Sequence, residues 1–213
     1  GGTHLCPQVM EASTGTVVNQ GVAAIVRRPR YDLTDLSWDE PALLVIADRL
    51  QDPGNLGTII RTAEAAGANA LITTQFTVEP WNDKALRASM GAALRLPIVT
   101  GVKLDELVSF CRLHKLKITA SRPTLPPPAR GVRKARAAGK SIIYTDANFK
   151  IPLALILSKE AGGAAEATAA TADEFVSIPM TSGVESLNVA AAAAILLYEV
   201  VRQRNFFAAA PRP

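Results

Sequence analysis

Three short polar segments, each directly after an expected strand, contain the side chains that could carry out chemistry. The first is Asp52-Pro-Gly-Asn-Leu-Gly-Thr-Ile-Ile-Arg-Thr62, in which Asn55 is expected to cap a helix. Gly54, Gly57 and Arg61 fall on one face of that helix. The glycines would let another backbone approach the Arg61 guanidinium, which can bind a phosphate or sugar oxygen through two N–H groups. Spacing alone equally allows Asn55 to be only a cap and Arg61 to form a surface ion pair.

The second and third segments combine glycines with small polar residues. Leu157-Ser-Lys-Glu-Ala-Gly-Gly163 ends a strand in paired glycines, which suits a loop whose amides contact a ligand, or a plain turn. In the third segment, residues 178–190, Ser186 and Asn188 stand at the start of a helix and precede a run of five alanines, 190–194. Alanines permit very close helix packing, although a simple capped core helix explains the same pattern.

Several common site chemistries are excluded by what the sequence lacks. It contains neither G-x-G-x-x-G nor G-x-x-x-x-G-K-[ST], so no dinucleotide fingerprint or P-loop is indicated. His4 and His114 are the only histidines, and Cys6 and Cys111 are isolated, which argues against a histidine triad, a disulfide framework and a metal site. The chemistry must therefore use Arg, Asn, Glu, Ser and backbone groups, and no metal is expected.

The elements that would position these segments alternate between strand and helix. Apolar runs predict strands at 42–47, 69–74, 96–99, 118–121, 153–157 and 175–178, with an earlier candidate at 22–26. Helices are predicted at 55–66, 83–94, 104–115 and 186–204. On the last helix, one face contains Leu187, Ala191, Ala194, Ile195, Tyr198 and Val201. The alternation predicts an α/β fold, a mostly parallel sheet with helices on both faces and ligands at the carboxyl ends of its strands.

Length and composition describe an ordinary globular chain. At 213 residues, 48% hydrophobic and 20% charged, it can bury one sizeable core. No apolar run approaches the roughly 18–20 residues of a membrane-spanning helix, so no membrane partner is expected. No charged stretch followed by an apolar one opens the sequence, and the two lone thiols suit a reducing compartment, so a cytoplasmic location is expected.

Positive charge is concentrated rather than spread. The formal net charge is +4, and residues 107–145 contain no Asp or Glu. Nine basic residues lie in that stretch: Arg112, Lys115, Lys117, Arg122, Arg130, Arg133, Lys134, Arg136 and Lys140. A second cluster contains Arg27, Arg28 and Arg30. One-sign blocks attract phosphate backbones, so Arg130, Arg133, Lys134 and Arg136 are expected to bind RNA; a loop kept basic for solubility is the alternative.

Taken together, the three segments resemble the motifs of the SpoU (TrmH) family of knotted RNA methyltransferases. Residues 52–57 with Arg61 and Thr62 resemble the first motif, Glu160 with Gly163 the second, and residues 178–180 with 186–189 the third. The resemblance implies a C-terminal trefoil knot and a homodimer whose sites combine residues of both subunits. It also implies transfer of a methyl group from S-adenosylmethionine to a ribose 2′-hydroxyl of RNA. Residues 41–206 would form this domain, 207–213 a tail, and 1–40 a tail and linker with one strand, following a missing N-terminal RNA-binding domain.

The resemblance also assigns individual residues. Those expected to bind the cofactor are Ser158, Gly163, Ile178, Met180, Leu187 and Ala120. Arg61 would orient and stabilise the reacting hydroxyl, and its polar surroundings would be Asn55, Glu160, Ser186 and Asn188. The third motif favours rRNA as substrate, with tRNA as the alternative. Ser158, Lys159 and Ala161 depart from the usual second motif, so a silent RNA-binding module of the same fold is the rival interpretation.

Overall fold

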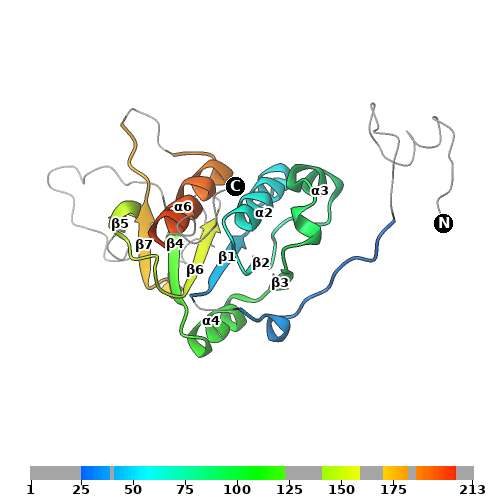
Figure 1. Cartoon of the computed structure of the whole chain (residues 1–213), viewed down its shortest axis with the longest axis horizontal. Helices are drawn as coiled ribbons and strands as arrows, with labels where there is room; N and C mark the ends of the chain where they lie inside the picture. The colour runs from blue at the N-terminus through cyan, green and yellow to red at the C-terminus, as the bar shows by residue number, and fades with distance from the viewer. Residues whose placement is uncertain (1–24, 39–40, 123–140, 159–169, 182–185, 205–213) are drawn as a thin grey trace, which may run out of the picture.

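Seven strands form one sheet in the part of the chain that the computed structural model describes, residues 25–38, 41–122, 141–158, 170–181 and 186–204 (Figure 1). In chain order the strands are β1 (Leu43–Asp48), β2 (Ala70–Thr74), β3 (Ile98–Val102), β4 (Lys117–Ser121), β5 (Ser141–Ile143), β6 (Leu153–Ser158) and β7 (Glu174–Ser177). Their spatial order is β3-β2-β1-β6-β4-β7-β5, and every neighbouring pair is parallel. The predicted parallel sheet is confirmed.

The centre of the sheet is buried on both faces because its strands are apolar throughout. Leu44 of β1 pairs with Ala70 on one side and with Ala154 on the other. Alternate residues of β1 point to opposite faces and into two hydrophobic clusters, Leu43 into one and Ile46 into the other. A continuous apolar run rather than an alternating one is what a strand covered on both sides requires.

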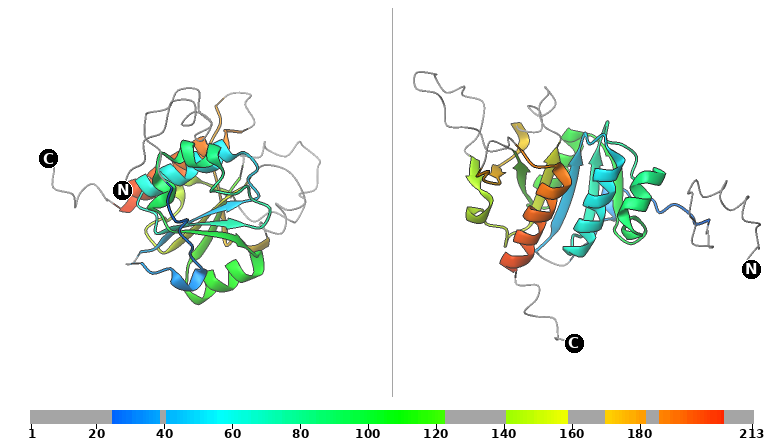
Figure 2. Two further views of the ribbon diagram at one scale, coloured as in Figure 1. Left: turned by 90° about the vertical axis from the view of Figure 1, so that its right-hand side faces the viewer. Right: turned by 90° about the horizontal axis from the view of Figure 1, so that it is seen from above.

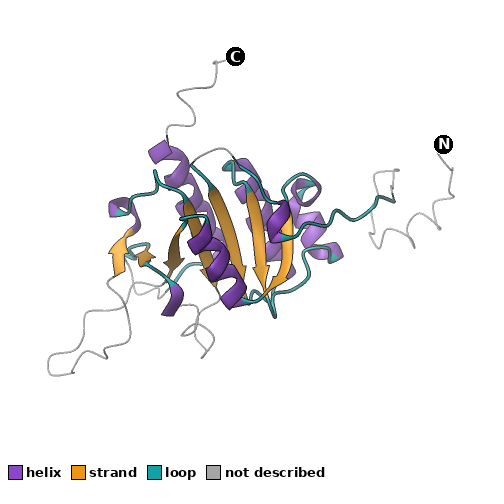
Figure 3. Cartoon of the chain, turned by 90° about the horizontal axis from the view of Figure 1, so that it is seen from below, coloured by secondary structure: helices purple, strands orange, loops and turns teal. Residues whose placement is uncertain are grey.

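Helices cover both faces, as predicted. On one face lie α2 (Pro53–Ala65), α3 (Asp83–Ser89) and α6 (Val189–Arg204), and on the other lie α4 (Leu104–Leu113) and the short 3-10 turn η1 (Leu33–Asp35) (Figure 2, left). Seen from below, the central strands of the sheet run side by side in the same direction (Figure 3). None of the helices in the described ranges is long and apolar enough to cross a membrane.

Two helix starts and one helix end are among the boundaries that differ from the sequence predictions. Asp52, not Asn55, caps α2, because its Oδ1 accepts from the backbone N–H of Asn55 at 2.7 Å and Pro53 occupies the first turn. Helix α6 begins at Val189 rather than near Ser186. The helix predicted at 83–94 ends at Ser89, because Met90 and Gly91 adopt left-handed backbone conformations, and a 3-10 turn, η2 (Ala92–Leu94), follows.

The N-terminal part of the described chain packs partly on the domain. Ile25 and Val26 are exposed and not in a strand, contrary to the strand expected at 22–26, whose other residues lie outside the described ranges. Leu33 is buried, and the Trp38 ring lies 6.0 Å from that of Phe110 on α4. Parts of the loops expected to belong to the trefoil knot, 159–169 and 182–185, also lie outside the described ranges.

Unexpected small elements complete the sheet edge. Strand β5, which was not predicted, has three residues and is followed by the 3-10 turn η3 (Tyr144–Asp146). A three-residue strand carries too little periodicity to be recognised from sequence.

The C-terminal end of helix α6 is fixed by hydrogen bonds to the segments that precede β1 and β6. The Arg204 guanidinium donates to the carbonyl oxygens of Pro41, Ala42, Phe149 and Ile151 at 2.6–2.9 Å. The helix buries Ala193, Leu196, Leu197 and Val200 against the sheet and α2. The residues that the sequence placed on one face of this helix are therefore not all on the same side of it: Val201 is buried, whereas Ala191 and Tyr198 are exposed.

Candidate functional site

A cavity of about 550 Å³ lies at the carboxyl edge of the sheet, where helices α2 and α6 begin. Strands β4, β6 and β7 end at this cavity. Its lining consists of Leu50, Gln51, Asp52, Asn55, Ser121, Arg122, Ser158, Val176, Ile178, Met180, Ser186, Leu187, Asn188, Val189, Ala192 and Leu196. The volume is in the range of small-molecule sites, roughly 300–1,000 Å³, and the carboxyl edge of a parallel sheet is where such sites occur.

The first turn of α2 forms one wall. Asp52 caps the helix and its Oδ2 accepts from the Lys84 ammonium at 3.1 Å. The backbone N–H of Asn55, followed by the Lys84 ammonium, holds the pKa of Asp52 below its ordinary value. Asp52 is therefore a carboxylate at neutral pH, and it fixes the start of α2 so that Asn55 faces the cavity.

The first turn of α6 meets this wall through a pair of amides. The Asn188 side-chain oxygen accepts from the backbone N–H of Ala190 at 2.8 Å, as an N-cap does. Its Nδ2 donates to Oδ1 of Asn55 at 3.1 Å. Two segments separated by more than a hundred residues are thus joined at one point, and both helix N-termini contribute partial positive charge there.

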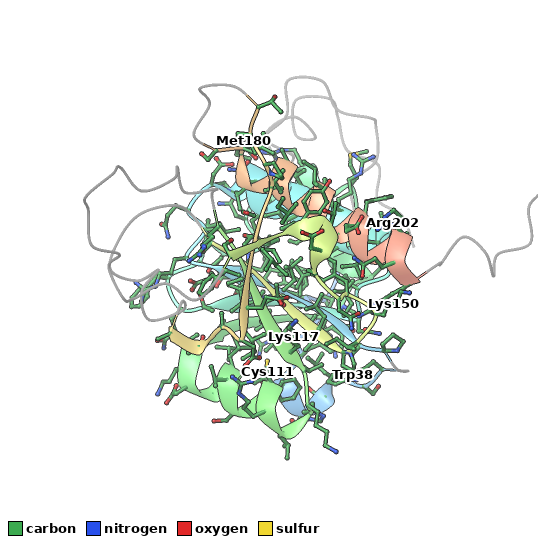
Figure 4. The ribbon with its side chains drawn as sticks, turned by 90° about the vertical axis from the view of Figure 1, so that its left-hand side faces the viewer. Trp38, Cys111, Lys117, Lys150, Met180 and Arg202 are labelled. Atoms are coloured by element: carbon green, nitrogen blue, oxygen red, sulfur yellow. The ribbon has the colours of Figure 1, made fainter. Side chains whose placement is uncertain are left out.

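The opposite wall is apolar. It contains Val176 at the end of β7, Ile178 and Met180 just beyond it, and Leu187 before α6. Met180 lies beside the start of α6, across the sheet from Cys111 and Trp38 (Figure 4). A flat heterocycle can pack on such a wall while the hydroxyl of Ser158 and the amides opposite supply hydrogen bonds.

Arg122 lines the cavity and was not expected there. It directly follows β4, and its guanidinium lies 4.5 Å from the ring centroid of Phe175. Burial lowers the pKa of this guanidinium below its ordinary value. Of the described lining residues only Asp52 and Arg122 carry charge, so Arg122 gives the cavity a cation. The sequence placed Arg122 among the charges of a basic loop, and only its position after a strand could have suggested a site.

Most predicted site residues that the structure describes lie together at this cavity. They are Asn55, Ser186 and Asn188 of the expected polar group, and Ser158, Ile178, Met180 and Leu187 of the expected cofactor group. Ala120 does not line it: the residue is buried in the cluster facing α4, and its neighbour Ser121 lines the cavity instead, because successive strand residues point to opposite faces. Glu160 and Gly163, and the basic residues Arg130, Arg133, Lys134 and Arg136, lie outside the described ranges.

Arg61 is exposed on α2 and does not line the cavity. It stands six residues beyond Asn55, about 9 Å further along the helix axis. The backbone that approaches the glycine face of α2 belongs to this chain: a Cβ on Gly57 would lie 2.3 Å from the carbonyl oxygen of Ala85 on α3. Gly57 therefore serves helix packing, contrary to its expected role beside the guanidinium.

Two charges of the basic stretch are neutralised in the fold. Arg112 forms an ion pair with Asp173 at 2.8 Å, and Lys117 forms one with Glu174 at 2.8 Å. Both acids stand at the start of β7, far from the stretch in sequence but adjacent to β4 in the sheet. The positive charge of residues 107–145 is therefore partly neutralised by acidic residues from elsewhere in the chain.

The fold and cavity define an α/β protein with a cavity of small-molecule size where its parallel strands end. The profile of the SpoU rRNA methylase family matches residues 42–198, and the chain belongs to that family.

Individual relatives agree with this assignment. The chain is similar to a 23S rRNA (uridine(2479)-2′-O)-methyltransferase of Streptomyces viridochromogenes, with 33% identity over 86% of this chain and 60% of that protein. It is also similar to the 23S rRNA (guanosine-2′-O-)-methyltransferase RlmB of Escherichia coli, with 31% identity over 93% of this chain and 77% of that protein. The structure of an AdoMet-bound rRNA methyltransferase from Sinorhizobium meliloti matches with a TM-score of 0.79 and 30% identity, over 92% of this chain and 70% of that one. The chain thus spans less than two thirds of the first relative.

Proposed function

We propose that this chain transfers a methyl group from S-adenosylmethionine to the 2′-hydroxyl of a ribose in rRNA. The observation that carries the proposal is the joining of the first and third motifs at one cavity, where Asn55 and Asn188 are hydrogen-bonded to each other and Ser158 lies in the same lining. Relatives at 31% and 33% identity are named as 23S rRNA 2′-O-methyltransferases, which supports rRNA rather than tRNA.

The residues present fit the donor. Ile178, Met180 and Leu187 provide an apolar wall for adenine, and Ser158 with the amides at the helix starts provides hydrogen bonds for its polar parts. When bound, the donor supplies an electrophilic methyl group on its sulfonium. Ser158 departs from the usual second motif, but it leaves room for the donor, because a cavity of about 550 Å³ remains beside it.

Arg61 is proposed to orient the ribose hydroxyl and to stabilise its developing negative charge. A guanidinium is always protonated, so it is a poor base, and the hydroxyl proton would pass to a phosphate oxygen or to water. Because Arg61 does not line the cavity of its own subunit, we place it at the cavity of a second subunit.

That placement of Arg61 requires a homodimer, which is part of the proposal. The outer face of α6 carries exposed Ala191 and Tyr198, whose side chain is 47% exposed although it is aromatic. Small and aromatic residues on one helical face suit close helix contact. Light scattering at micromolar concentration should give twice the chain mass, and Tyr198→Arg should give the monomer mass; a monomer for the unaltered chain would contradict the proposal.

RNA is proposed to be held in part by the basic residues beyond Arg122, namely Arg130, Arg133, Lys134 and Arg136. Their contacts would be with phosphates and therefore salt-dependent and indifferent to base sequence. Replacing all four with Gln should weaken RNA binding and flatten the slope of log affinity against log salt while leaving donor affinity unchanged. An unchanged slope would favour the solubility interpretation.

Calorimetry with S-adenosylmethionine tests the proposal against the silent RNA-binding module. The unaltered chain should bind the donor, and Leu187→Lys should abolish that binding by placing a charge on the apolar wall. Leu113→Lys is the matched control, since Leu113 is 77% exposed on α4, which covers the other face of the sheet, and this variant should bind normally. RNA binding without donor binding in the unaltered chain would support the module instead.

A further inference from the structure

An exposed aromatic ring and an arginine lie beside the cavity and take no part in the site described above. Phe76, just after β2, is 71% exposed, and the Arg49 guanidinium, just after β1, lies 5.2 Å from its ring centroid. Phe76 belongs to neither hydrophobic cluster of the described residues. Its ring therefore remains in water without contributing to the core.

Both residues adopt backbone conformations that side chains of this size rarely take. The φ angle is +53° at Arg49 and +66° at Phe76, in the left-handed region. For a bulky residue this conformation is strained, and such strain concentrates at functional sites. A glycine or asparagine would occupy either position with less strain, and neither exposed side chain compensates for that strain by burial in the core.

The two loops are held rigidly against each other. The Thr77 hydroxyl donates to the Ala47 carbonyl oxygen at 3.0 Å, and the Val78 N–H donates to that of Leu50 at 2.7 Å. The Gln51 side-chain amide donates to the carbonyl oxygens of both Arg49 and Phe76. The ring and the guanidinium are thus presented by a fixed backbone.

Gln51 also connects this pair to the cavity. It lines the cavity together with Leu50 and Asp52, the next residues along the chain from Arg49. Because β1 and β2 are adjacent and parallel, both loops leave the sheet at the edge where the cavity opens. The pair therefore lies beside the cavity in which the proposed function places the methyl donor.

We propose that Arg49 and Phe76 form a stacking platform for an unpaired RNA base that neighbours the methylated nucleotide. Unpaired bases are bound by stacking on aromatic rings and arginine planes, and the guanidinium adds attraction for the phosphate backbone. A preorganised platform avoids ordering a loop when RNA binds. The proposal rests on the proposed function and specifies how that site selects single-stranded substrate.

Binding of a single-stranded oligoribonucleotide carrying one 2-aminopurine, compared with a duplex of the same length, tests the platform. Phe76→Ala should weaken single-strand binding by about 5- to 150-fold and reduce the 2-aminopurine fluorescence change, while duplex binding stays within about twofold. Phe76→Tyr keeps the ring and should retain binding. Phe76→Gly should weaken binding equally while raising the thermal midpoint, because glycine relieves the strained backbone.

Other outcomes would overturn the platform. Equal losses for single strand and duplex, or no loss for either, would mean that Phe76 does not stack on a base. Unchanged RNA affinity together with a changed mass in light scattering would show a protein contact instead. Donor calorimetry on the same proteins separates the two proposals: normal donor binding without a Phe76 effect refutes only the platform, and a Phe76 effect without donor binding refutes only the methyl transfer.

Discussion

Replacing Gly57 with alanine tests the helix packing that positions the cavity. The added Cβ would lie 2.3 Å from the Ala85 carbonyl oxygen and 2.7 Å from the Ala88 Cβ, so α2 and α3 must separate by about 1 Å to restore van der Waals contact. Overpacking of this kind costs up to about 3 kcal/mol. The better helix propensity of alanine returns about 1 kcal/mol. The net expectation is a loss of about 2 kcal/mol, or roughly 4–8 °C in Tm.

Urea and thermal unfolding measure this loss. Thr58→Ala, one residue further along α2 and exposed, is the matched control and should change the unfolding free energy by less than about 0.5 kcal/mol. Adding Ala88→Gly should not rescue Gly57→Ala, because the closer clash is with a backbone oxygen. Donor affinity should also fall, since α2 carries Asn55 to the cavity. A stability equal to or above that of the unaltered chain would refute this account of the glycine.

Four further expectations address single residues. Arg61→Ala should lower kcat/KM of methyl transfer more than tenfold, above about 1.4 kcal/mol, with donor affinity unchanged in calorimetry; a smaller loss contradicts its catalytic role. Asn188→Ala should lower the unfolding free energy by about 1 kcal/mol in urea, and Asn188→Asp should retain the cap. Burial raises the pKa of the Cys111 thiol to about 12. In the Cys6→Ser variant Cys111 is the remaining thiol, and in the folded protein it should resist Ellman's reagent at about pH 8; rapid reaction would show an accessible thiolate instead. Arg202 holds the pKa of Glu199 below its ordinary value of 4.5, so the stability that the unaltered chain has over Glu199→Gln in urea unfolding should be full above that pH and should shrink as the pH falls below it.

Much of the fold could be predicted from sequence because the signals are local. The apolar run in β1 predicts a strand, and Gly67 predicts the end of α2, in both cases without reference to the rest of the chain. Helix α3 shows the limit of that reasoning, since its end depends on a left-handed Met90 that no helix propensity indicates, although the adjacent Gly91 was a usable stop signal.

The candidate site was predictable where motifs supplied the residues and not where the fold brings distant residues together. The family resemblance placed Asn55 and Asn188 in one site, but nothing in the sequence predicts their direct hydrogen bond or the ion pair of Arg112 with Asp173; these contacts exist because β6 and β7 are inserted beside β1 and β4. Ser121 rather than the expected Ala120 lines the cavity, because successive residues of a strand point to opposite faces and the sequence does not show which face meets the cavity.

The most direct test of the central claim is to incubate the chain with S-adenosylmethionine carrying an isotopically labelled methyl group and rRNA, then to identify the labelled nucleoside by mass spectrometry after digestion. The proposed function predicts one labelled nucleoside carrying the methyl group on its ribose 2′-oxygen, and loss of the label with Leu187→Lys but not with Leu113→Lys. Label on a base, or no label from protein that binds both donor and RNA, would contradict it.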